Sequence, residues 1–241
     1  HVEFFMNIVQ TDSISWHKDE IDILKAYAII SVIILHTLPS EISSNLISIL
    51  TVYQAVPIFF ILMGRNLGAS YLRRSYKTLG EIYKKKYFVS NFNRIVFPFL
   101  LIFIISFFYG VLFLSENKMY LGFMNLAGLM PVQGPGNYFV TILLQCIFIF
   151  PIIFVSFRKY PNVTMFFCFI LSFTYEAIAP HISILSNNSY LYKSCILRYI
   201  FAIVLGLWLL MGTGDLREIF KRKFLWFGLI ISIFYIFVFS L

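Results

Sequence analysis

Long apolar stretches, separated by shorter polar and charged ones, run along the whole chain. A helix of about 20 apolar residues crosses the hydrocarbon core of a membrane, and the length varies by a few residues, with tilted helices being longer. The pattern predicts seven helical spans, at residues 22–38, 46–63, 95–114, 138–157, 163–179, 196–211 and 224–241. Because backbone polar groups inside lipid must be satisfied within each segment, we expect an all-α fold, a polytopic integral membrane helical bundle.

Composition leads to the same class. Hydrophobic residues make up 60% of the 241 residues, charged residues only 12%, and the chain contains 29 Phe and 15 Tyr. If this chain were water-soluble, its charged side chains would be too few to cover so much apolar surface. Lipid must cover it instead, and we expect residues 1–241 to form a single membrane domain.

The distribution of Lys and Arg predicts the orientation of this domain. The connection at residues 65–94 carries eight of them, and the same side of the membrane receives Arg158, Lys159 and the basic residues of segment 217–223. Since Lys and Arg near span ends stay cytoplasmic, we expect a cytoplasmic N-terminus in a plasma or inner membrane. The net charge of +8 then reflects this bias and contact with anionic lipids, so it indicates no nucleic-acid partner.

Two basic side chains lie at opposite ends of the first expected span. Lys25 and His36 are eleven residues apart, which in a helix is about three turns plus 20° and roughly 16 Å, so they share one helix face. Basic residues inside a membrane are costly and often functional. The alternative is that Lys25 extends its amine to the surface and His36 makes an interfacial hydrogen bond.

Other polar residues have both a functional and an ordinary interpretation. Asp22 is three residues before Lys25, so it could hold that amine in position or form a surface pair of little energy. Arg65 is either an anchor or a phosphate contact, and the run Lys84 to Lys86 is more typical of a lipid-facing cluster. Gln145 and Glu176 are buried-site candidates. The three cysteines have no metal-ligand or CxxC spacing, so the sequence indicates neither a metal site nor a disulfide framework.

Several of these motifs resemble the acyltransferase-3 family of membrane O-acyltransferases. The basic residue and histidine of its first helix correspond to Lys25 and His36. The sequence VPIFFILMG at 56–64 resembles its second helix, with Met63 where serine is usual. The sequence NRIVFP at 93–98 resembles the entry to its third helix, where Asn91 replaces the first of two arginines and Arg94 keeps the second. The segment GPGNYF at 134–139 resembles the start of a later helix.

The resemblance implies an O-acyltransferase that takes an acetyl group from cytoplasmic acetyl-CoA, as a substrate and not a permanently bound cofactor. It implies a hydroxyl of a cell-envelope or exported glycan as the acceptor. His36, the only histidine within an expected span, is the catalytic candidate, and Lys25, Arg94 and Asp22 are the donor-binding candidates. Members of the family usually have about ten helices, so we expect the chain to hold about seven of them and to be truncated at its C-terminus.

Two other functions are also compatible with the sequence. A transporter, flippase or polymerase component for envelope polysaccharide would also be rich in aromatic residues and basic on its cytoplasmic side. Such transporters often contain internal repeats, and the sequence contains none that we detect. A non-catalytic, degenerate member of the family is the third interpretation, because Met63 and Asn91 depart from the family pattern.

Overall fold

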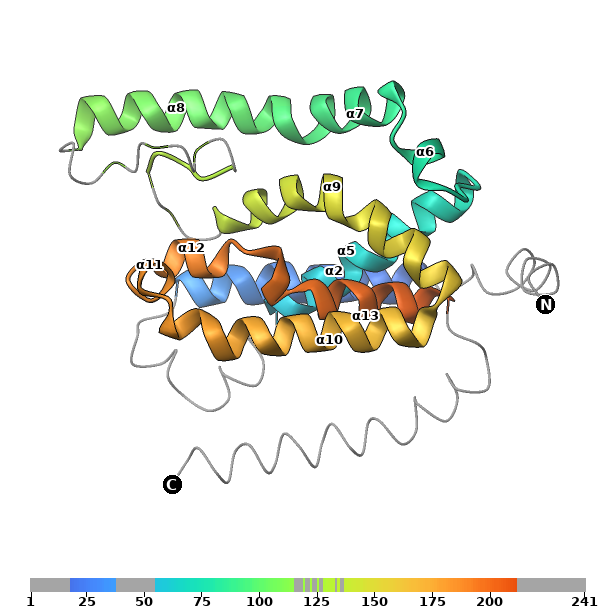
Figure 1. Ribbon diagram of the computed structural model, residues 1–241. Helices are drawn as coiled ribbons and strands as arrows, with labels where there is room; N and C mark the ends of the chain where they lie inside the picture. The colour runs from blue at the N-terminus through green and yellow to red at the C-terminus, as the bar shows by residue number, and fades with distance from the viewer. Residues whose placement is uncertain are drawn as a thin grey trace. The chain divides into compact units, whose positions relative to one another are not determined.

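The computed structural model describes residues 18–37, 55–114, 119, 122, 125, 128–132, 134 and 137–211. All regular secondary structure within these residues is helical, so the expectation of an all-α fold is confirmed. The chain divides into two compact units, residues 1–69 with 205–241 and residues 70–204. Figure 1 shows the helices in chain order.

The first unit contains α2 (Lys18–Thr37), most of α5 (Ala55–Arg73) and most of α13 (Ile200–Met211). The backbones of α5 and α13 touch where Gly206 meets α5. A Cβ atom added to Gly206 would lie 1.9 Å from the carbonyl oxygen of Ile61 and 2.9 Å from the backbone nitrogen of Arg65. Small residues allow such close approaches between membrane helices, where dispersion contacts replace the hydrophobic effect as the attraction.

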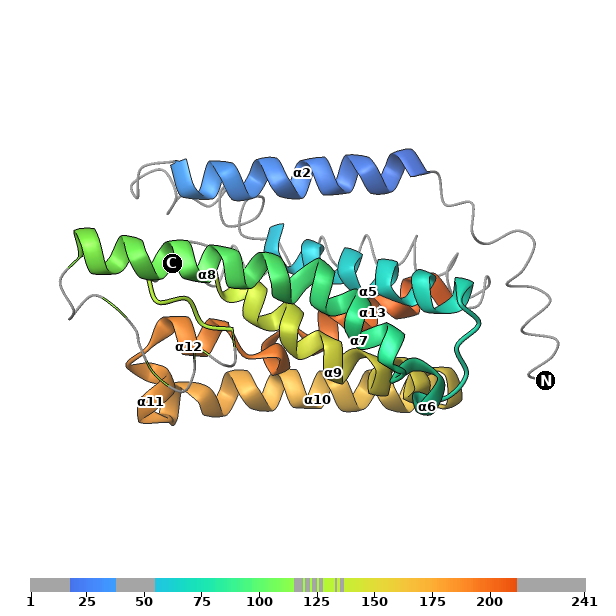
Figure 2. The ribbon, with the colours of Figure 1, turned by 90° about the horizontal axis from the view of Figure 1, so that it is seen from above.

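The second unit contains a long helical rod near its start. It consists of α7 (Lys85–Asn91), the π-helical turn η1 (Phe92–Val96) and α8 (Phe97–Phe113), which follow one another without a break (Figure 2). The short helix α6 (Leu79–Ile82) precedes the rod and begins with a capping box of Thr78 and Glu81. Hydrogen bonds from the backbone N–H groups of Lys77 and Thr78 lower the pKa of the Glu81 carboxyl.

The core of the second unit is built on α9 (Tyr138–Lys159). This helix runs antiparallel to α10 (Pro161–Ile178) and packs against it (Figure 1). Nine residues of α9 are buried, among them Phe150 and Phe154, whose rings meet the edge of Tyr71 at centroid distances of 5.3 and 5.1 Å. The Tyr71 hydroxyl bonds the hydroxyl of Tyr87, so aromatic packing and a polar contact tie α7 into this core.

Short helical pieces follow α10. They are η4 (Ala179–His181), α11 (Ser183–Ser186), α12 (Ser189–Lys193) and η5 (Ile196–Arg198), after which α13 begins. In Figure 1, α11 and α12 lie at the end of the antiparallel pair where α10 finishes. The chain therefore reaches α13 through a broken segment at this end of the unit.

Four helices in the described part of the chain are long and apolar enough to cross a membrane: Ala55–Arg73, Lys85–Phe113, Tyr138–Lys159 and Pro161–His181. They correspond to the second, third, fourth and fifth expected spans. The first expected span is the 20-residue α2, which carries several charges in its first half. The sixth is shorter than expected because α13 begins at Ile200 and has 12 residues, and the seventh lies outside the described residues.

Candidate functional site

Lys25 lies on a face of α2 that also carries two buried residues. Ile21 and Ala28, on the same helix face, are 8% and 0% exposed, whereas Ile23 and Ile33 on other faces are 67% and 56% exposed. The apolar exposed side suits contact with lipid. Lys25 itself is intermediate in exposure.

The amine of Lys25 is held by Asp22. Its Nζ donates to Oδ1 of Asp22 at 2.8 Å, with 43% of the Lys25 side chain and 67% of the Asp22 side chain exposed. The ion pair expected from the spacing is therefore present. At this exposure solvent screens the pair, and it adds at most about 1 kcal/mol to stability. Its main effect is to limit where the amine can point.

His36 lies in the last turn of α2, which is helical from Lys18 to Thr37. The backbone between Lys25 and His36 is therefore one uninterrupted helix, and the separation of about 16 Å and the shared face follow from helix geometry. A single rigid element fixes the two positions relative to each other.

Arg94 lies in the π-helical turn η1 of the second unit, and its side chain is exposed. The turn has a local cause. Pro98 has no N–H to donate to the carbonyl four residues earlier, which is that of Arg94, and the N–H of Phe97 reaches back five residues to Phe92. Such π turns inside α-helices occur frequently at functional sites. Asn91, which stands where the family has its first arginine, donates its side-chain amide to the carbonyl of Tyr87.

A charged and aromatic group of side chains gathers at the end of α10. We call it the Arg198 cluster and define it as Glu176, Arg198, Tyr192, Tyr199 and Tyr138. The Arg198 Nε donates to Oε1 of Glu176 at 2.9 Å, and the Tyr192 hydroxyl donates to the other carboxylate oxygen. The guanidinium lies 4.5 Å from the ring centroid of Tyr192 and 5.6 Å from that of Tyr199, and Tyr138 stacks on Tyr199.

The broken backbone beside this cluster is held by three other polar side chains. Gln145 donates to the carbonyl of Ser194 at 2.7 Å and accepts from the N–H of Ile196 at 2.9 Å. Ser172 donates to the carbonyl of Leu197 and accepts from the N–H of Phe201, and Tyr175 donates to the carbonyl of Tyr192. Gln145, a buried-site candidate in the sequence, is thus occupied with satisfying non-helical backbone, which lipid could not do.

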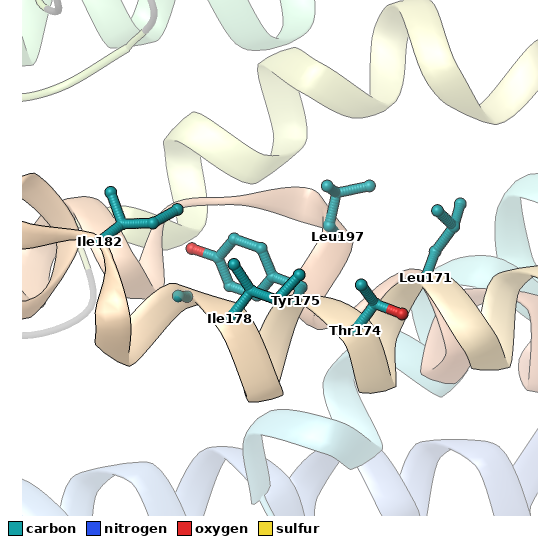
Figure 3. A pocket seen from close by; sticks show the side chains of 7 residues that line it. Leu171, Thr174, Tyr175, Ile178, Ile182 and Leu197 are labelled. Carbon is teal, nitrogen blue, oxygen red and sulfur yellow. The ribbon is translucent and has the colours of Figure 1, made fainter.

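A small apolar pocket lies next to the cluster. Its volume is about 210 Å³, and it is lined by Leu171, Thr174, Tyr175 and Ile178 of α10 together with Ala179, Ile182 and Leu197. Figure 3 shows Tyr175 between α10 and Leu197, with its ring toward the pocket. The same ring stacks on Tyr192 at a centroid distance of 5.9 Å, so Tyr175 links the pocket to the Arg198 cluster.

Comparison with protein families supports the resemblance found in the sequence. The family model described as an acyltransferase domain, that of the acyltransferase-3 family, matches residues 18–241. The chain belongs to the acyltransferase-3 family. No curated protein and no solved structure is significantly similar to it. With its long apolar helices, it is a multi-pass membrane acyltransferase.

The structure places the candidate residues of this acyltransferase in two groups. Asp22, Lys25 and His36 are on α2 in the first unit, and Arg94 is in the second. The described residues contain no group of three or more His, Cys, Asp or Glu side chains suited to a metal ion. Sequence reasoning singled out Glu176 but missed its partners, because a tyrosine-rich sequence gives no sign of which rings surround an arginine.

Proposed function

We propose that this acyltransferase moves an acetyl group from acetyl-CoA to a hydroxyl of a cell-envelope or exported glycan. The family supports acyl transfer. The observation that carries the proposal is the continuous helix α2, which fixes an anchored amine and a histidine eleven residues apart on one face. This arrangement suits a reaction whose donor and acceptor approach from opposite sides of a membrane.

The chemistry moves one proton and exchanges one bond for another. The acceptor oxygen attacks the thioester carbonyl carbon, a C–O bond forms, and the C–S bond breaks. His36 takes the proton from the hydroxyl group and returns it to the leaving sulfur of coenzyme A. Neutral imidazole is suited to this task because its ordinary pKa lies near physiological pH. Alternatively, His36 carries the acetyl group for a time as a covalent intermediate, which splits the transfer into two steps.

We expect charge to attract the donor. Coenzyme A carries phosphates, and Lys25 and Arg94 are the basic residues proposed to contact them. An N-terminus in the cytoplasm, in the plasma or inner membrane, places the start of α2 on the side where acetyl-CoA is made. The same orientation places the exposed amines of Lys84, Lys85 and Lys86 among anionic lipid head groups.

The first test is His36→Ala in the full-length protein, produced in cells at matched membrane levels. We expect glycan acetylation to fall by about two orders of magnitude or more, since that is typical for loss of a general base. His181→Ala is the matched control, because His181 is exposed in η4 and belongs to none of the proposed sites. Acetyl content of the isolated glycan is the measurement, and near-normal acetylation by His36→Ala would remove His36 from the chemistry.

A further inference from the structure

We infer that the Arg198 cluster binds a sugar ring of the acceptor. The inference rests on the proposed function, since it gives the acceptor a binding site on this chain. A sugar presents hydroxyl groups that both donate and accept hydrogen bonds, and patches of C–H groups that pack on aromatic faces. The cluster offers partners for each: a carboxylate, a guanidinium and three tyrosine rings.

The cluster has hydrogen-bonding capacity left for a ligand. The ion pair uses Nε of Arg198, and within the described part of the chain the structure records no hydrogen bond from its two terminal nitrogens. Each carboxylate oxygen of Glu176 accepts one bond and can accept another. The Arg198 and Glu176 side chains are 28% and 42% exposed, so a ligand can reach both. Adjacent sugar hydroxyls could therefore bridge them.

The fold does not depend on this ion pair to hold the broken segment. Gln145, Ser172 and Tyr175 already bond the backbone between Tyr192 and Phe201. A partly exposed ion pair adds little stability, so the stability of the fold does not account for its presence. The combination of charge, stacked rings and access is better explained by a polar ligand than by packing.

The position of the cluster agrees with an acceptor on the far side of the membrane. It lies at the end of the α9–α10 pair opposite to Arg158 and Lys159, which belong to the last turn of α9, next to the turn between the two helices. The positive-inside rule assigns that turn to the cytoplasm. The cluster then belongs to the outer side, where an exported glycan is found.

The test uses purified full-length protein and the host glycan stripped of its acetyl groups as the probe. Arg198→Gln should raise the dissociation constant of this glycan, and its apparent KM in acetyl transfer, by about tenfold or more. The KM for acetyl-CoA should stay unchanged. Arg198→Lys, which keeps the charge but loses the planar fork, should give an intermediate value. Lys193→Gln is the control, because Lys193 is an exposed cation of the same segment outside the cluster.

The double variant Glu176→Arg with Arg198→Glu separates binding from structure. It keeps an ion pair at this place but reverses the groups that a sugar would meet, so glycan affinity should stay low. Recovery of wild-type affinity in the double variant, or unchanged affinity in Arg198→Gln, would overturn the inference. Glycan binding that depends on Arg198 in a protein without acetyl transfer would uphold the site while refuting the proposed function.

Discussion

Lys25 illustrates how a single charged residue is accommodated near the end of a membrane helix. Its neighbours on the same face, Ile21 and Ala28, are buried, and its amine is neutralised by Asp22. The pair with Asp22 limits where the amine can point, and its contact with a negatively charged donor is our proposal.

Substitution of Lys25 tests this interpretation. Lys25→Ala should weaken coenzyme A binding by about tenfold, the value of one charge-assisted hydrogen bond, and Lys25→Arg should weaken it less. Lys85→Ala is the comparison, because it removes an exposed cation that we assign to lipid. Calorimetric titration of the purified proteins with coenzyme A measures the effect. Equal affinity in the wild type and Lys25→Ala would exclude Lys25 from the donor site.

Among the helices, hydrophobic length predicted where apolar helices lie better than where they end. The expected spans 138–157 and 163–179 agree closely with α9 and α10. By contrast, α5 continues ten residues past Met63, and the third helix begins at Lys85, ten residues before the expected start. Polar residues mark the edge of the hydrocarbon region, but Lys, Arg and Leu also favour helices, so the helix does not end there.

For the candidate site, too, the sequence predicted local features but not contacts between distant segments. The Lys25 to His36 helix and the Asp22 pair follow from spacing within one element. The π turn at Arg94 depends on a proline four residues later, and the Arg198 cluster depends on how η5 folds back toward α10. Contacts between distant segments are set by tertiary packing, which no local pattern encodes.

The contact between α5 and α13 gives a prediction at this scale. Gly206→Ala should destabilise the protein by about 1–3 kcal/mol, because its methyl group meets the backbone of Ile61. Gly68→Ala should cost less, since it meets the ends of the Leu207 and Leu210 side chains. Gly80→Ala meets nothing within 4 Å and is the control. The free energy of unfolding, measured in detergent for the three variants, gives their order of stability. A Gly206→Ala protein as stable as the Gly80→Ala protein would contradict this packing.

In the whole molecule, basic side chains are unevenly distributed between the two ends of the helices. They gather at residues 65–94 and at the end of α9, whereas the Arg198 cluster lies at the other end of the α9–α10 pair. This asymmetry is the basis for a cytoplasmic donor and an outer acceptor.

Thiol labelling in intact cells tests the orientation. Asn187→Cys should react with an impermeant thiol reagent, whereas Lys85→Cys should react only after the membrane is opened, because we place Lys85 in the cytoplasm. Both positions are exposed, and replacing the partly accessible Cys195 by serine removes the native background. The reverse labelling pattern would invert the proposed topology.

Transfer of labelled acetyl groups to the glycan tests directly whether the protein is an O-acetyltransferase. Membrane vesicles that contain the full-length protein are supplied with acetyl-CoA labelled in its acetyl group and with the de-acetylated envelope glycan, and label is measured in the recovered glycan. The account predicts label as an alkali-labile ester, formed by the wild type and the His181→Ala protein and lost with His36→Ala. Equal labelling by vesicles with and without the protein would contradict it.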